Sequence, residues 1–462
     1  MTVSRRFLAP VVLPADPSCT VLRDAAVDVG PDGRITYCGP AADAPPVPDA
    51  HPRTALTGIL APGLVNAHAH SPMTLLRGLG GDLPLLAWLQ DAVWPAEARM
   101  TSRDARAGML LGCVEMLRYG VTTSAEMYAH PEAVADAALE AGSRILLAPA
   151  YFDRPGDGWR SAVDGIGKWI DADGLRFGAG ERVELCYGPH SAYTLPPEAL
   201  RATAEEAGRR GALVHIHVAE TLAEDAEQRA QHGSVPQLLR DTGLLDGRLL
   251  AAHAVHLSAT DIRLLAESGA GVAHCPGSNG KLASGTAPVH ALRAASVTVG
   301  LGTDGPASND DLDLWEEARL AMMFSRLATG DPLALTAADA FLMATSAGAA
   351  ALGRTDIGAL RPGNWADLVH VSVDGPQFAT GVDVPDERLL ANLVWAAGSR
   401  AVRDVWVAGE PVVADGETVR VDRPAAMRAA AEAAARNVRS EDHTSVHQSL
   451  VNGWRMACCG CK

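Results

Sequence analysis

The feature that most constrains this chain is an alternation, repeated eight times between residues 56 and 305, of a short apolar run and a longer segment with helical spacing. The segments between the runs are rich in Ala, Leu, Glu and Arg. Two of them, PEALRATAEEAGRRG and SATDIRLLAESG, begin with Pro or Ser and end with Gly, as capped helices do. Alternating strands and helices form a parallel sheet covered by helices, and eight units are the number that closes a (β/α)8 TIM barrel. An open doubly wound sheet would also fit the alternation, but no Gly-x-Gly-x-x-Gly follows a run, which disfavours a nucleotide cofactor.

The two ends of the chain have a different pattern, with short β-like runs separated by turn clusters such as Gly30-Pro31-Asp32-Gly33. We therefore expect four segments. Residues 1–57 and 357–422 are predicted to pair into one small β-sandwich domain, beside a barrel formed by residues 58–356. Residues 423–462 are predicted to form an alanine-rich helix followed by a loose tail.

The composition excludes several classes of protein. The chain has 462 residues, 48% of them hydrophobic, which is enough for a large core. Its formal net charge of -16 disfavours binding to nucleic acid or to anionic lipid, and favours a small neutral or zwitterionic substrate. No apolar stretch is long enough to span a membrane, and the N-terminus lacks the apolar run of a secretory signal. We expect a cytoplasmic protein.

Five of the eight cysteines, Cys19, Cys38, Cys113, Cys186 and Cys275, are scattered through apolar surroundings, as reduced thiols are. The other three, Cys458, Cys459 and Cys461, crowd the last five residues. They could bind a soft metal, but nothing nearby completes a four-ligand site, and a disordered tail is the favoured interpretation.

The polar residues that close the eight runs are the candidates for a functional site, since active sites of such barrels lie at the carboxyl ends of the strands. In chain order they are His68 and His70, Glu126, His190, His215 with His217 and Glu220, His253 and His256, His274 with Ser278 and Asn279, and Asp304. In this region only His130, His232 and His290 lie between runs. Histidines placed for packing would not concentrate at one end of the runs.

The spacing of these residues predicts a catalytic metal site. Side chains at i and i+2 of a strand point to the same side, so His68 and His70 can share one ion. With a histidine of the fifth run and Asp304 they would bind a divalent ion such as zinc, iron or manganese, which lowers the pKa of bound water. Glu220 would then donate a proton to a substrate nitrogen.

Several choices stay open at this level. The residues alone do not decide between His215 and His217, or between His253 and His256. The carboxylate of Asp304 could instead cap the turn that its Asp-Gly pair predicts.

The motifs PGLVNAHAHSPMTLLRG, WPAEARM, GPHSAYT, HIHVAET, AAHAVHLS, CPGSNGKLASG and LGTDGPASND together resemble the amidohydrolase superfamily. Within it they resemble the methylthioadenosine/S-adenosylhomocysteine deaminases and their relatives, the triazine chlorohydrolases. The resemblance spans roughly residues 10 to 420, in the expected order.

The resemblance implies one metal ion, zinc first, with Fe2+ or Mn2+ as alternatives, held by His68, His70, His217 and Asp304. It implies that Glu220 handles protons and that His253 orients the hydrolytic water. Binuclear members carry a bridging carboxylated lysine at the end of the fourth strand, where VELCYGPHS has none, so one ion is expected. The family tendency is to form homo-oligomers.

The same resemblance implies the substrate contacts. Glu97 matches the glutamate that binds ribose hydroxyls, His190 matches the histidine that contacts the heterocycle, and Arg160 matches the arginine that meets an amino-acid carboxylate. A second such arginine is replaced in RILLAPAYFD by Ala148-Pro149-Ala150, which disfavours S-adenosylhomocysteine.

We therefore predict a metal-dependent aminohydrolase (deaminase) acting on adenosine, 5'-deoxyadenosine, methylthioadenosine or S-adenosylhomocysteine. One alternative is a hydrolase of an s-triazine or another N-heterocycle such as guanine. The other is a non-catalytic metal-binding protein, which would require a missing ligand or acid.

Overall fold

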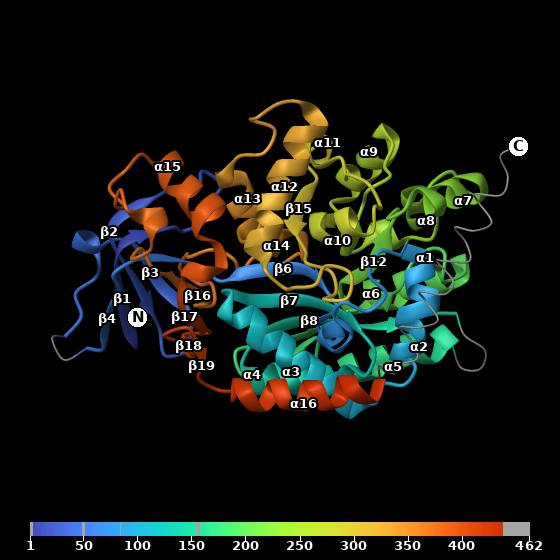
Figure 1. Cartoon of the computed structure of the whole chain (residues 1–462), viewed down its shortest axis with the longest axis horizontal. Helices are drawn as coiled ribbons and strands as arrows, with labels where there is room; N and C mark the ends of the chain where they lie inside the picture. The colour runs from blue at the N-terminus through green and yellow to red at the C-terminus, as the bar shows by residue number, and fades with distance from the viewer. Residues whose placement is uncertain (1–2, 49–50, 84, 154–157, 438–462) are drawn as a thin grey trace, which may run out of the picture.

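The computed structural model describes residues 3–48, 51–83, 85–153 and 158–437. Within these ranges the strands form two groups, one in the middle of the molecule and the other at one end of its long axis (Figure 1). One group is parallel and alternates with helices. The other is a mixed sheet that combines strands from both ends of the chain.

Each of the eight apolar runs contains at least one strand of the parallel group. These strands are β6 (Leu64–Ala69), β7 (Val121–Tyr128), β8 (Arg144–Tyr151), β10 (Val183–Leu185), β11 (Gly188–Pro189), β12 (Val214–Val218), β13 (Leu249–His253), β14 (Gly271–His274) and β15 (Thr298–Leu301). They pair in chain order as two sheets, β6 to β11 and β12 to β15; the short antiparallel β9 (Arg176–Phe177) edges the first.

Isolated parallel bridges connect the two sheets at both ends. Tyr187 pairs with Val214, and Ala69 pairs with Asp304. The second bridge brings the last strand beside the first, so the parallel series returns to its start. All carboxyl ends of these strands lie at one edge, where the polar residues that close the runs are found.

Helices lie between and after these strands. They are α3 (Ser102–Arg118), α4 (Pro131–Ala141), α5 (Gly158–Asp173), α6 (Pro197–Arg210), α7 (Leu222–His232), α8 (Val235–Asp241), α9 (Ala259–Ser268), α10 (Pro276–Lys281), α11 (Val289–Ala294), α12 (Leu314–Thr329), α13 (Ala337–Met343) and α14 (Ser346–Ala351). The two segments that the sequence predicts to be capped helices are α6 and α9. In α9, Ser258 and Asp261 form a capping box, and Gly269 ends the helix with a φ of 72°.

The second group is a single nine-stranded sheet. Its strands are β1 (Arg5–Val12), β2 (Leu22–Val29), β3 (Ile35–Pro40), β4 (Arg53–Ala55), β5 (Ile59–Pro62), β16 (Leu368–Val371), β17 (Val402–Val407), β18 (Glu410–Ala414) and β19 (Glu417–Thr418). Strand β5 pairs with β1 on one side and with β16 on the other, so the two ends of the chain meet there. Residues 59–62 were expected in the barrel segment, but here they lie in the sheet.

A buried ion pair joins the two groups. Arg144, at the start of β8, contacts both carboxylate oxygens of Asp367, which precedes β16, at 2.9 and 3.1 Å. The Arg144 side chain is 0% exposed and that of Asp367 2%. The same guanidinium donates to the carbonyl oxygens of Gly180 and Glu181. The charge of Arg144 is therefore paired with Asp367, and four of its five N–H groups have hydrogen-bond acceptors within the protein.

The predicted alanine-rich helix is α16 (Arg423–Asn437), which lies along α3 (Figure 1). Two contacts fix its end. Arg99 donates to the carbonyl oxygen of Asn437 at 2.9 Å through Nε, and Arg436 contacts Asp104 at 2.6 Å. The end of α16 is thus attached to the segment around Arg99.

The five scattered cysteines are free thiols, as expected, and four of them are buried. The cysteine cluster at 458–461 and the tail after residue 437 lie outside the described residues. Among the described helices, none combines the length and apolarity needed to cross a membrane.

Candidate functional site

The strand ends bring four predicted metal ligands together. His68 lies in β6 and His70 directly after it, His217 lies in β12, and Asp304 follows β15. Asp304 Oδ1 lies 3.3 Å from His68 Nε2 and 3.1 Å from His70 Nε2. His217 Nε2 lies 3.3 Å from His70 Nε2. Three imidazole nitrogens and one carboxylate oxygen therefore converge on one point.

Hydrogen bonds behind the rings fix which nitrogen faces this point. His70 Nδ1 donates to the carbonyl oxygen of Met127 at 2.5 Å, and His217 Nδ1 donates to that of His190 at 2.7 Å. A neutral imidazole has one N–H, so in the neutral form of each ring Nε2 presents a lone pair that can bind a cation.

The environment of His68 also fits a cation. Its Nδ1 lies 2.7 Å from His215 Nε2, while its own Nε2 is buried without a hydrogen-bond partner. Burial lowers the pKa of His68 to about 3 and that of His217 well below 6.5. Both rings are therefore neutral at physiological pH, which is the form that binds a metal ion.

Asp304 and His70 form the charged half of the cluster. Burial acts to raise the pKa of Asp304, but the imidazoles of His68 and His70 beside its Oδ1 outweigh that effect and hold the pKa well below 3.8. For His70 burial acts to lower the pKa, yet the contact with Asp304 raises it to about 9. A cation at the same nitrogen would displace that proton.

The other oxygen of Asp304 is held by two serines. Ser278 and Ser308 donate to Oδ2 at 2.6 and 2.8 Å, which leaves Oδ1 toward the histidines. Asp304 has a φ of 59° and His253 a φ of 69°, backbone conformations that side-chain-bearing residues seldom adopt. Backbone strain of this kind persists where the surrounding structure enforces it, and it clusters at functional sites.

Glu220 and His253 lie beside the four ligands. Glu220 Oε2 is 3.9 Å from His253 Nε2, and both side chains are buried. Burial raises the pKa of Glu220 above 4.5, which keeps its proton available closer to neutral pH. The geometry suits a carboxyl group that exchanges protons with a bound molecule.

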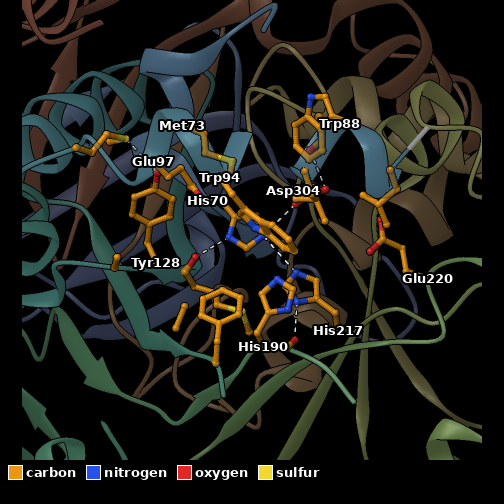
Figure 2. Close-up of a pocket in the computed structure, with 18 of the residues that line it drawn as sticks. His70, Met73, Trp88, Trp94, Glu97, Tyr128, His190, His217, Glu220 and Asp304 are labelled. Carbon is orange, nitrogen blue, oxygen red and sulfur yellow. Dashed lines mark hydrogen bonds and ion pairs between the residues drawn. The ribbon is translucent and has the colours of Figure 1, made fainter. Parts of the chain in front are cut away.

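Of these residues, five line a cavity of about 380 Å3 (Figure 2): His70, His217, Glu220, His253 and Asp304. The imidazoles of His70, His190 and His217 point toward one another, with Glu97 and Tyr128 on one side and Glu220 on the other. The remaining wall is largely apolar and aromatic: Met73, Leu85, Trp88, Leu89, Trp94, Met100, Met127, Phe152 and Tyr193. A volume of this size accommodates a small heterocyclic ligand.

Glu97 and His190, predicted as substrate contacts, both line the cavity. Glu97 lies in α2 (Trp94–Glu97), and it forms a hydrogen bond with the buried phenol of Tyr128. The pKa of His190 is lowered to about 3 by burial, so its ring is neutral. The cavity thus has a carboxylate at one end and the ligand cluster at the other.

Other predicted residues are placed away from the cavity. Arg160 lies on α5, its side chain is 69% exposed, and it pairs with Glu198 at 2.8 Å. It does not line the described part of the wall. His256 turns toward the loop at Ser284, whose carbonyl oxygen it contacts at 2.7 Å.

Two further candidates support the ligands from behind. His215 contacts His68 rather than the cavity, and Glu126 accepts hydrogen bonds from the backbone and hydroxyl of Ser71 at 3.0 and 2.6 Å. The structure distinguishes the histidines of each open pair. His217 and His253 line the cavity, whereas His215 and His256 do not.

The sequence interpretation missed the apolar wall and Tyr128. Most wall residues come from residues 73–100, which contain 3-10 and π turns in η2 (Ser71–Leu76) and η3 (Trp88–Val93) around α1 (Leu85–Ala87). Such a segment has no single period to recognise. Tyr128, Phe152 and Tyr193 could have been predicted to line the cavity, because each closes or follows an apolar run.

The chain is similar in sequence and in fold to proteins of one known family. The model of the amidohydrolase family matches residues 59–412. A 5-methylthioadenosine/S-adenosylhomocysteine deaminase of Pelotomaculum thermopropionicum is 43% identical over 387 residues, 83% of this chain and 88% of the relative. An adenosine deaminase of Xanthomonas campestris, solved with bound zinc, superposes with a TM-score of 0.86 at 36% identity, covering 94% of this chain and 98% of the other.

An atrazine chlorohydrolase of Arthrobacter aurescens, solved with zinc, is more distant. It superposes with a TM-score of 0.83 at 24% identity, covering 93% of this chain and all of the other. At this identity the likeness concerns the fold.

Proposed function

Because this chain belongs to the amidohydrolase family, we propose that its cavity hydrolyses the 6-amino group of an adenine nucleoside, giving the inosine analogue and ammonia. The observation that carries the proposal is that one cavity combines a carboxylate suited to bind ribose with a cluster of metal-binding side chains. Glu97 lies at one end, suited to accept hydrogen bonds from ribose hydroxyls, and the cluster of His68, His70, His217 and Asp304 lies at the other.

The donor set fits a divalent ion of borderline softness, zinc first, since three neutral imidazole nitrogens and one carboxylate oxygen meet within reach of each other. When bound, such an ion polarises water and lowers its pKa toward neutrality.

The residues of the chain supply the proton transfers. Glu220 donates a proton to ring nitrogen N1 as water attacks C6, and His253 orients that water through Nε2. Asp304 accepts a proton from the water and passes it to the amine, which leaves as ammonia. The remaining hydroxyl proton returns to Glu220 as the C6 carbonyl forms, which restores the protonated carboxyl group. His190, held neutral by burial, contacts the heterocycle.

The cavity wall favours a nucleoside with a small, uncharged 5' group. Among the described wall residues none is Lys or Arg, and Arg160 is paired with Glu198 at the surface. A zwitterionic 5' substituent would leave its carboxylate unpaired against an apolar wall, at a cost of several kcal/mol. Adenosine, 5'-deoxyadenosine and methylthioadenosine are therefore preferred to S-adenosylhomocysteine.

We also propose that the parallel series, from Leu64 to residue 356, forms a (β/α)8 barrel, with residues 1–62 and 357–422 as the accessory β domain and residues 423–462 as a terminal segment. The closed order of parallel strands and the parallel bridges between the two sheets support the barrel. Cytoplasmic location and assembly into a homo-oligomer stay predictions.

The test is a substrate panel with zinc-loaded protein: adenosine, 5'-deoxyadenosine, methylthioadenosine, S-adenosylhomocysteine, guanine and a chlorotriazine, followed by ammonia release and ultraviolet absorbance. We expect activity on the uncharged adenine nucleosides. Glu220→Gln should lower kcat by about 10²- to 10⁴-fold with zinc still bound, whereas Glu227→Gln on the exposed face of α7 should not. Turnover of the triazine alone would refute the proposal.

A further inference from the structure

The back of His253 is held by an amide that the mechanism above does not use. His253 Nδ1 lies 3.0 Å from Asn279 Oδ1, and both residues are buried, at 1% and 2% exposure. We propose that Asn279 is a positioning residue that keeps the proton of His253 on Nδ1 and so directs the Nε2 lone pair into the cavity. The inference rests on the proposed function of the cavity and deepens it.

The chemistry of the contact gives it a direction. An amide oxygen only accepts hydrogen bonds, so the nitrogen that faces it carries the proton. A neutral imidazole has one such proton, and Nε2 is left as an acceptor. An acceptor at Nε2 can orient a water by receiving one of its protons, which turns a lone pair of that water toward the substrate. A protonated Nε2 would instead donate its proton to that lone pair of the water, which would then no longer face the substrate.

The ring of His253 is held in this orientation. It stacks on His217 with centroids 5.5 Å apart and 21° between the planes, and it meets His68 edge-on at 5.3 Å. Its Nε2 lies 3.9 Å from Glu220 Oε2, on the cavity side. With the ring orientation held by its neighbours, the position of the proton is the remaining variable, and Asn279 controls it.

Asn279 is itself held firmly. It lies on α10, where its backbone N–H donates to Cys275 and its carbonyl oxygen accepts from Ser284, at 3.0 and 2.9 Å. The buried Glu317 of α12 accepts from the backbone N–H of Gly277 at 2.9 Å, which ties the same short helix down. These contacts hold the backbone of Asn279, and since its side-chain Nδ2 is buried without a hydrogen-bond partner among the described residues, the polar contact of the amide is the one with His253.

The adjacent residue has a parallel contact. Ser278 donates to Asp304 Oδ2, so two consecutive side chains of α10 hold two different groups of the site. The motif CPGSNGK of the seventh run thus has a structural explanation. Its serine and asparagine act through Asp304 and His253 rather than on the substrate.

The first experiment compares Asn279→Ala, Asn279→Asp and Asn364→Ala as zinc-loaded proteins, measuring kcat, KM, bound zinc and thermal unfolding. Asp at 279 still accepts from Nδ1, whereas Ala cannot. Asn364 is an equally buried asparagine with two hydrogen bonds outside the cavity, which makes it the matched control. We expect Asn279→Ala to lower kcat by about 10- to 100-fold, the usual cost of removing a group that orients a site histidine. KM and bound zinc should change less than about threefold.

The rescue distinguishes positioning from packing. We expect Asn279→Asp to keep kcat within about tenfold of the wild type, and Asn364→Ala to affect unfolding alone. Wild-type kcat in Asn279→Ala, or an Asp variant as impaired as the Ala variant, would overturn the proposal.

The second experiment needs no substrate and no variant of Asn279. Nitrogen-15 NMR of the zinc-loaded, histidine-labelled protein reports which ring nitrogen carries the proton, with the His253 signals identified by their loss in His253→Gln. We expect the proton on Nδ1, and finding it on Nε2 would overturn the inference even if Asn279→Ala did not fold. A proton on Nδ1 in a protein that deaminates no nucleoside would refute the proposed function while supporting the role of Asn279.

Discussion

Removing the two serine hydroxyls that hold Asp304 should weaken zinc binding in a measurable and non-additive way. Ser278 and Ser308 donate to the same oxygen, Oδ2, at 2.6 and 2.8 Å, and all three side chains are buried. The two contacts leave Oδ1 as the oxygen that faces His68 and His70. Ser278→Ala or Ser308→Ala removes one of them without touching a proposed ligand.

The magnitude follows from the charge of the acceptor. A hydrogen bond to a charged group contributes about 1.5–3 kcal/mol, and about 1.4 kcal/mol corresponds to a tenfold change in an equilibrium constant. Each single variant should therefore lose up to about 100-fold in zinc affinity, within the range known for groups behind metal ligands. Because the remaining serine compensates in each single variant, the double variant should lose more than the product of the two.

The assay is zinc competition against a chelator of known affinity, on the two single variants, the double variant and Ser258→Ala. Ser258 caps α9 outside the cavity, so its replacement should cost about 1 kcal/mol of stability and leave zinc affinity unchanged. If the double variant binds zinc within twofold of the wild type, the proposed role of Asp304 as a ligand held by its second oxygen is wrong.

Three further predictions concern the surroundings of the site. Asp367→Ala should destabilise the protein by about 3–5 kcal/mol, because it leaves the guanidinium of Arg144 buried and unpaired; denaturant unfolding measures this. Burial raises the pKa of Glu224 to about 8, so the folded protein binds a proton there that the unfolded chain releases above about pH 4.5. The free energy of unfolding should therefore fall as pH rises from about 4.5 through 8. Glu224→Gln should flatten that part of the profile of stability against pH. Arg99→Ala, which frees the end of α16, should raise KM more than it lowers kcat, because the same segment carries Glu97.

Each of these has a matched control. Arg106→Ala disrupts an ion pair whose side chains are more than 40% exposed and should cost no more than about 0.5 kcal/mol. Glu227→Gln and Arg103→Ala, both at exposed positions, should leave the pH profile and KM unchanged. Equal effects in a variant and its control would contradict the burial argument behind it.

The eight strands and their capped helices could be predicted because their signals are local. Burial gives each strand a run of apolar residues, and helix ends need particular capping groups. The extent of each unit was less predictable. The first run divides at Gly63, where a Cβ would lie 2.0 Å from the hydroxyl oxygen of Thr122. Residues before this glycine join the nine-stranded sheet and residues after it join the parallel series.

The site likewise contains residues whose placement could be predicted from the sequence and one whose placement could not. His68, His70, His217 and Asp304 could be proposed because the carboxyl ends of parallel strands in such a barrel share an edge and the family motifs agree. Arg160 was also proposed from a motif, yet it lies at the surface beside Glu198. A motif places a residue along the chain, but the direction of a loop side chain depends on contacts that sequence neighbours do not determine.

The sequence by itself therefore determined the alternation of strands and helices, the residues at the strand ends and the kind of metal they suit. These depend on periodicity and on side-chain chemistry, which any stretch of the chain carries with it. The tertiary structure alone decided which nitrogens of His70 and His217 face the cavity, that His215 contacts His68, and that Asn279 contacts His253. Those facts arise from pairs of residues distant in sequence that folding brings together, so no local pattern encodes them.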